Sequence, residues 1–114
     1  MDSILTSIKK LLGIAEEFEH FDVDVIMHIN SAFSTLAQLG VGPVSGFTVS
    51  DKETKWDDFA SVANISNIEN VKRYVYLKTR LIFDPPANGV ITDSIKEDIR
   101  ELEWRLNVQY ETNV

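Results

Sequence analysis

The sequence contains no cysteine, only three prolines, and no long hydrophobic run. The lack of cysteine excludes disulfide bonds, thiolate metal sites and thiol nucleophiles together, and it fits a reducing compartment. A chain without an apolar stretch of about 20 residues has no expected membrane span. The N-terminus, Met1-Asp2-Ser3, also lacks the basic start of a secretory signal. We therefore expect a protein that neither spans nor is targeted to a membrane.

The composition is that of an ordinary folded protein with an excess of acidic residues. At 114 residues the chain has the usual length of one domain, so residues 1–114 are expected to form a single domain. The net charge of -7 repels the phosphate backbone of nucleic acids, which disfavours tight DNA wrapping. A surface that DNA slides past is compatible with this charge, but solubility explains it as well.

Helical periodicity and helix-end residues predict a mainly α fold, a small bundle of about four helices. Gly13 ends the first predicted helix, Asp22 caps the second, and Ser66 with Glu69 forms a capping box at the start of the third. The third helix stops near Phe83 because a Pro-Pro pair follows. The predicted ranges are 3–12, 22–40, 66–83 and about 92–109.

Between the second and third predicted helices, the sequence favours a short β-hairpin or an extended loop. Phe47 and Val49 alternate with polar residues, and the segment 55–57 can pair with them across a turn at 51–54. Two strands alone are only marginally stable. Such a hairpin would therefore have to lie on the helices or on a neighbouring subunit.

The last predicted helix has apolar residues on two faces. Trp104 points away from the stripe that is expected to face the core, and Val108 stands one turn beyond it. A large aromatic residue in this position has to be covered by the hairpin or by another chain, so Trp104 and Val108 are candidate subunit-interface residues. The core stripe consists of Ile95, Ile99, Leu102 and Leu106.

Arg73 and Arg80 share the polar face of the third predicted helix, and two interpretations remain open for them. In the first, Glu69 and Arg73 form an ion pair four residues apart and the arginines hold acidic neighbours in the same chain. In the second, the acidic neighbours belong to another subunit. Under this second interpretation, Arg73 and Arg80 are further candidate interface residues.

No pattern typical of an enzyme is present, so we assign no catalytic, cofactor-binding or metal-binding residue. A nucleophile elbow, a phosphate-binding loop and a dinucleotide fingerprint are all missing. His20 and His28 are too far apart to form a helical metal site. A group of His20, Asp22 and Asp24 is explained by helix capping and solvation, although a small metal-dependent enzyme built on it stays an alternative.

Several segments, in their order and spacing, resemble those of head-tail connector (adaptor) proteins of tailed bacteriophages, in particular of the siphophage neck. The resemblance covers nearly the whole chain. The segments that carry it are Phe21-Asp22-Val23-Asp24, Ile29-Asn30, Leu39-Gly40-Val41-Gly42-Pro43, Trp56-Asp57-Asp58-Phe59, Val75-Tyr76-Leu77-Lys78, Phe83-Asp84-Pro85-Pro86 and Leu102-Glu103-Trp104-Arg105-Leu106-Asn107.

The resemblance implies a structural virion protein without catalytic residues or cofactors. Its subunits are expected to assemble in the host cytoplasm into a closed ring of about twelve copies beneath the portal protein. Such a ring extends the channel through which double-stranded DNA passes without specific binding, and it joins the head to the next neck or tail protein. Candidate portal or partner contacts in loop and terminal segments are Phe47, Val49, Trp56, Asn107 and Tyr110.

Two other functions stay open at the level of the sequence. The chain can be a neighbouring neck protein, such as a stopper or a tail-completion protein. It can also be an acidic binding module that mimics DNA or inhibits a host protein, since its net charge is -7.

Overall fold

Five helices follow one another in the computed structural model, which describes residues 3–65 and 68–112, the last three by their backbone only. They are α1 (Ile4–Leu12), α2 (Asp22–Gln38), α3 (Trp56–Ala63), α4 (Glu69–Phe83) and α5 (Gly89–Thr112). The predicted mainly α fold is confirmed. The predicted number of about four helices is too low by one, because α3 was not expected.

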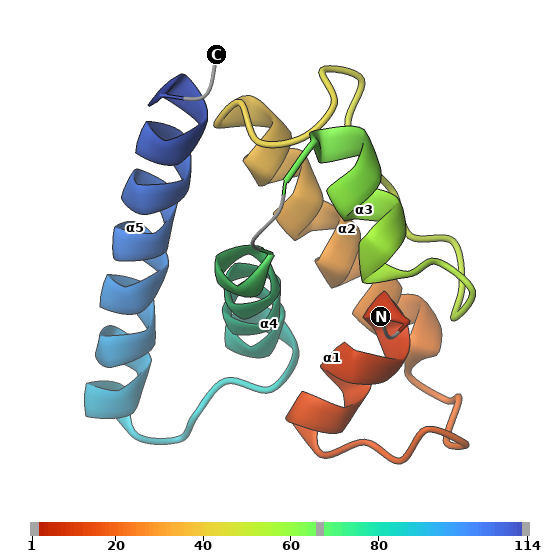
Figure 1. Cartoon of the computed structure of the whole chain (residues 1–114). Coiled ribbons are helices and arrows are strands. Elements are labelled where there is room, and N and C mark those ends of the chain that lie inside the picture. Colours follow the sequence, from red (N-terminus) through yellow and green to blue (C-terminus); the bar gives the residue numbers. More distant parts are fainter. Residues whose placement is uncertain (1–2, 66–67, 113–114) are drawn as a thin grey trace.

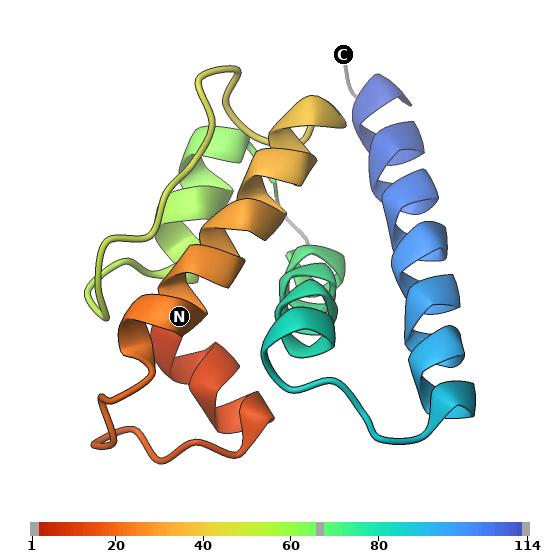
Figure 2. The same ribbon diagram turned by 180° about the vertical axis from the view of Figure 1, so that it is seen from behind.

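α4 is the central helix of the fold (Figure 1). It packs against α2 and α5 and also contacts α1. α5 stands on one side of α4, and α1, α2 and α3 lie on the other, as the reverse view in Figure 2 also shows. The buried apolar side chains of these helices form one core cluster, in which the largest fully buried members are Trp56, Tyr74, Phe33 and Phe59.

Both ends of α1 and the C-terminal end of α2 follow from local sequence signals. The predicted N-cap Asp22 is wrong, because Asp22 is the first residue of α2 and the N-cap is Phe21, without a side-chain cap. The Ser3 side chain accepts a hydrogen bond from the backbone N–H of Thr6 at 3.2 Å, and Gly13 ends α1 with a φ of 82°. This left-handed conformation is open to glycine at little steric cost. After α2, the backbone N–H of Val41 donates to the carbonyl of Leu36 at 2.8 Å, so the chain folds back at this helix end.

The predicted β-hairpin is wrong, because none of the described residues lies in a strand and an extended loop joins α2 to α3. One side chain holds this loop on α2. Asn30 accepts a hydrogen bond from the backbone N–H of Val49 at 2.7 Å and donates its own amide to the Val49 carbonyl at 3.0 Å. The Asn30 side chain thus supplies both bonds that a neighbouring strand would have supplied.

Residues 55–57, predicted as the second strand of that hairpin, instead begin α3. The Asp58 carboxylate accepts a hydrogen bond from the backbone N–H of Lys55 at 2.8 Å. Asp57 and Asp58 also place negative charge in the first helical turn, where it favours the helix. Packing also favours a helix over a strand here, because the helix places both Trp56 and Phe59 against the Phe33 ring of α2.

Tyr74 joins the centre of α4 to α5. Its side chain is buried, and its hydroxyl donates a hydrogen bond of 2.7 Å to the Glu103 carboxylate. Burial, and then the interaction with Glu103, raise the pKa of Tyr74 far above its ordinary value. The folded chain therefore keeps the phenol proton at a pH at which the unfolded chain loses it.

Tyr74→Phe is expected to lower the free energy of unfolding by about 1.5–3 kcal/mol at pH 7, because the carboxylate loses its donor. Above pH ~10 the unfolded chain releases the Tyr74 proton and the folded chain does not, so the stability of the parent protein falls as pH rises. The variant should lack this part of the fall. Urea unfolding at pH 7 and at pH above 10 measures both effects, and Tyr76→Phe, on a half-buried side chain, is the matched control.

Candidate interaction surfaces

The outer face of α5 carries the largest exposed aromatic side chain in the described part of the chain. Ile95 and Ile99, like the other predicted stripe residues Leu102 and Leu106, are buried. Trp104 lies on the other face and is 67% exposed. The predicted hairpin that could have covered it is not formed. The geometry predicted for Trp104 is therefore confirmed, and its contact with another chain stays a prediction.

Val108 lies one turn beyond Trp104 and is 38% exposed, so the two residues form an apolar area near the C-terminal end of α5. Along the helix before them, carboxylates are paired within the chain. Glu97 pairs with Arg100, and Glu101 lies 2.6 Å from the Arg105 guanidinium. This ion-paired section separates the Trp104 area from exposed apolar residues at the start of α5, which are Val90 and Ile91.

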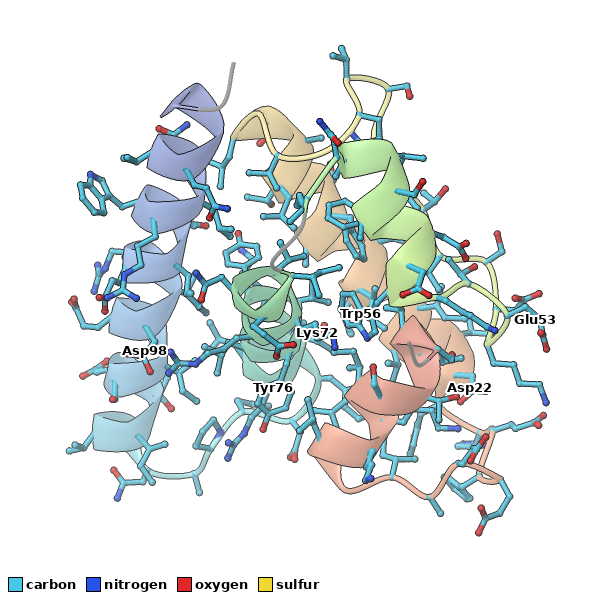
Figure 3. The ribbon with its side chains drawn as sticks, in the orientation of Figure 1. Asp22, Glu53, Trp56, Lys72, Tyr76 and Asp98 are labelled. Carbon is cyan, nitrogen blue, oxygen red and sulfur yellow. The ribbon has the colours of Figure 1, made fainter. Side chains whose placement is uncertain are left out.

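The two candidate arginines of α4 have partners within the chain. The Arg73 guanidinium lies 3.1 Å from the Asp98 carboxylate of α5, and the Arg80 guanidinium donates to the Tyr76 hydroxyl at 3.4 Å. Asp98 and Tyr76 lie on the side of the molecule seen in Figure 3. The expected pair of Glu69 with Arg73 is not the one formed, because Glu69 pairs with Lys72 at 3.6 Å.

The structure corrects the expected exposure of two candidate partner contacts. Val49 is 2% exposed and Trp56 is 1% exposed, so both side chains belong to the core of the chain itself. The indole N–H of Trp56 donates to the Ser7 hydroxyl at 2.8 Å. Phe47 is half-buried, with its ring 5.1 Å from that of Phe33. Of these three candidates, only Phe47 has part of its side chain at the surface.

The candidates near the C-terminus are only partly described. Asn107 is half-buried, and its side-chain amide donates to the Leu39 carbonyl at 3.0 Å, which ties α5 to the end of α2. The Tyr110 side chain lies outside the described residues. Asn107 therefore has an intramolecular role that the sequence did not reveal.

A buried lysine is the most unexpected polar feature. The Lys9 side chain is 3% exposed, and its ammonium donates to the carbonyls of Glu16 and Phe18 at 2.9 and 2.8 Å. It also lies 2.8 Å from a carboxylate oxygen of Asp22. Lys9 thus fixes the 13–21 loop and the start of α2 on α1. Lys9 also lies in the last turn of α1, where its positive charge favours the helix dipole.

The residues considered for a metal site serve other contacts. Asp22 is the ion-pair partner of Lys9, and the His20 ring packs against that of Phe21 at 4.9 Å. His28 lies against Phe83 at 6.3 Å between ring centroids. Within residues 3–65 and 68–112, no group of three or more histidine and carboxylate side chains is placed to hold a metal ion.

The sequence model of the family described as "Phage connector protein" matches residues 4–113. No curated protein and no solved structure matched the chain significantly. Among the helices of the described part, none is both long and apolar enough to cross a membrane.

Proposed function

Because the chain belongs to the phage connector protein family, we propose that this phage structural protein works as a head-tail adaptor in the virion neck. In this function, copies of the chain form a closed ring beneath the portal protein and continue the DNA channel. The ring then offers its far side to the next neck or tail protein. Assembly takes place in the host cytoplasm before the ring becomes part of the virion.

The observation that carries this proposal is the two-faced α5. One face is buried against α4, whereas the other presents Trp104 with 67% of its surface in water. Exposed tryptophans that become buried in a contact are among the residues that contribute most to binding. In a closed ring, a heterologous contact between two different surfaces covers such a residue once in every subunit.

The net charge of -7 supports passage of DNA without binding. A channel wall with an excess of carboxylates repels the phosphate backbone and so does not hold it. A DNA mimic is less well supported, because the carboxylates Glu97, Asp98 and Glu101 on α5 are each paired with an arginine of the chain. A DNA mimic needs rows of unpaired carboxylates, and carboxylates paired with arginines do not provide them.

Sedimentation of the purified chain, alone and mixed with portal protein, tests the adaptor function. Co-migration with portal protein is the expected result, whether the chain forms closed oligomers alone or only on the portal. A chain that stays monomeric and ignores the portal overturns the proposal and favours the acidic binding module. Oligomers that bind only the assembled neck, and never the portal itself, favour a stopper or a tail-completion protein.

Trp104→Ala is expected to weaken ring assembly about tenfold or more, since loss of a central interface tryptophan costs about 2 kcal/mol or more per contact. The quantity to measure is the chain concentration at which half of the material sediments as closed oligomer, with portal protein present if assembly depends on it. Val62→Ala, at an exposed apolar residue of α3, is the control and should leave assembly unchanged. If both variants half-assemble at the same concentration, Trp104 does not lie in the interface.

A further inference from the structure

A groove between α4 and α5 gathers positive charge on a chain that is negative overall. Its volume is about 280 Å³, and its apolar lining comes from Leu81 and Ile99. In the described part of the chain, Lys78 and Lys96 form no ion pair, whereas Arg100 pairs with Glu97. The Glu103 carboxylate at its edge accepts the hydrogen bond of Tyr74. The charged residues around the groove are Lys78, Lys96, Arg100 and Glu103.

The 13–21 loop has the opposite character. Glu16, Glu17 and Glu19 surround Phe18, and all four side chains are exposed, Phe18 to 49%. None of these glutamates forms an ion pair with another described residue. Lys9 binds the loop through the backbone carbonyls of Glu16 and Phe18, so it holds the loop without using the glutamate side chains. The Phe18 ring lies 5.7 Å from that of Phe21 and is still half exposed.

The loop and the groove are far apart in one molecule. In Figure 1, α5 stands at one edge of the molecule and the 13–21 loop lies at the opposite edge, and Figure 2 shows the same from behind. A loop held on α1 by a buried lysine therefore does not reach the groove beside α5 of its own chain. Another copy can bring its loop to this groove.

The geometry points to a contact between copies in which the 13–21 loop of one subunit docks into the α4–α5 groove of the next. Phe18 would pack on Leu81 and Ile99, and the flanking glutamates would face Lys78 and Lys96. The contact joins two different surfaces, which is the type of interface that a ring repeats until it closes. Opposite charges also fix the register of the contact. This inference rests on the proposed ring.

Reversing one charge on each side gives a specific test. In Lys96→Glu, position 96 of the groove and the loop glutamates are both negative; in Glu17→Lys, position 17 of the loop and Lys96 of the groove are both positive. Either variant alone is expected to need about tenfold or more protein for half-assembly, because like charges then face each other at each contact. A 1:1 mixture should recover assembly, since the two variants can alternate around the ring with opposite charges at every contact.

Recovery in the mixture also shows that both variants are folded. Lys55→Glu makes the same charge change as Lys96→Glu at an exposed position before α3, and it should assemble like the parent chain. If the parent chain forms rings and both reversals leave them unchanged, or if the mixture fails to recover, the loop–groove contact is wrong and the adaptor function stands. If the parent chain forms no ring, even on portal protein, the proposed function fails and the contact fails with it.

Discussion

Replacing Trp56 by alanine is expected to lower the free energy of unfolding by about 3–5 kcal/mol, the usual range for removing a large aromatic side chain from a core. Trp56 is 1% exposed and lies between α1 and α2, with its N–H bonded to the Ser7 hydroxyl and its ring 6.3 Å from that of Phe33. The substitution leaves a cavity there and removes one of the two hydrogen bonds of the Ser7 hydroxyl, which still donates to the Ile4 carbonyl. Urea unfolding followed by circular dichroism measures the change.

The second tryptophan provides a matched control. Trp104→Ala removes the same side chain from an exposed position, so it should change the stability of the monomer by no more than about 0.5 kcal/mol. The comparison needs a concentration at which the chain is monomeric, because covering Trp104 in an oligomer would add stability. Similar losses in the two variants would contradict the assignment of Trp56 to the core and of Trp104 to the surface.

Lys9→Met is expected to destabilise the protein by about 3–5 kcal/mol, because removing one member of a buried ion pair leaves the other without its partner. The ammonium of Lys9 lies 2.8 Å from the Asp22 carboxylate and also satisfies the carbonyls of Glu16 and Phe18. Methionine keeps the length and the apolar contacts of the side chain and loses all three polar contacts. Chemical unfolding measures the loss, and faster hydrogen exchange in residues 14–21 would locate it.

Lys10→Met is the matched control, because Lys10 is the next residue of α1 after Lys9 and its side chain is exposed. Its expected effect is within about 0.5 kcal/mol. A Lys9→Met variant as stable as Lys10→Met, with the same exchange in the loop, would show that Lys9 does not hold the loop in solution.

The parts of the fold that depend on neighbouring residues were predictable from the sequence. α1 begins after Ser3 and ends at Gly13, and α4 ends at Phe83, as their capping and proline signals indicate. The direction of Trp104 followed from the 3.6-residue period of the α5 core stripe. Each of these inferences uses residues that are at most a few turns apart in the same element.

The parts that failed depend on contacts between distant residues. The alternation around Phe47 and Val49 is typical of a strand, but the bonds that hold this segment come from Asn30, which lies 19 positions away. The local pattern around Trp56 did not reveal that its ring would be buried against α2 at the start of a short helix. The burial of Lys9 depends on the path of the 13–21 loop, which has no periodicity to read.

The two hydrogen bonds between the Asn30 side chain and the Val49 backbone also affect how the chain behaves at high concentration. An extended, β-prone segment with unused backbone groups is a template on which other chains can add as strands and aggregate. At Val49 the N–H and the carbonyl are both engaged by one amide side chain, and the Val49 side chain is buried. The backbone of Val49 therefore cannot pair with a strand of another copy, which disfavours cross-β association of the chain at high concentration.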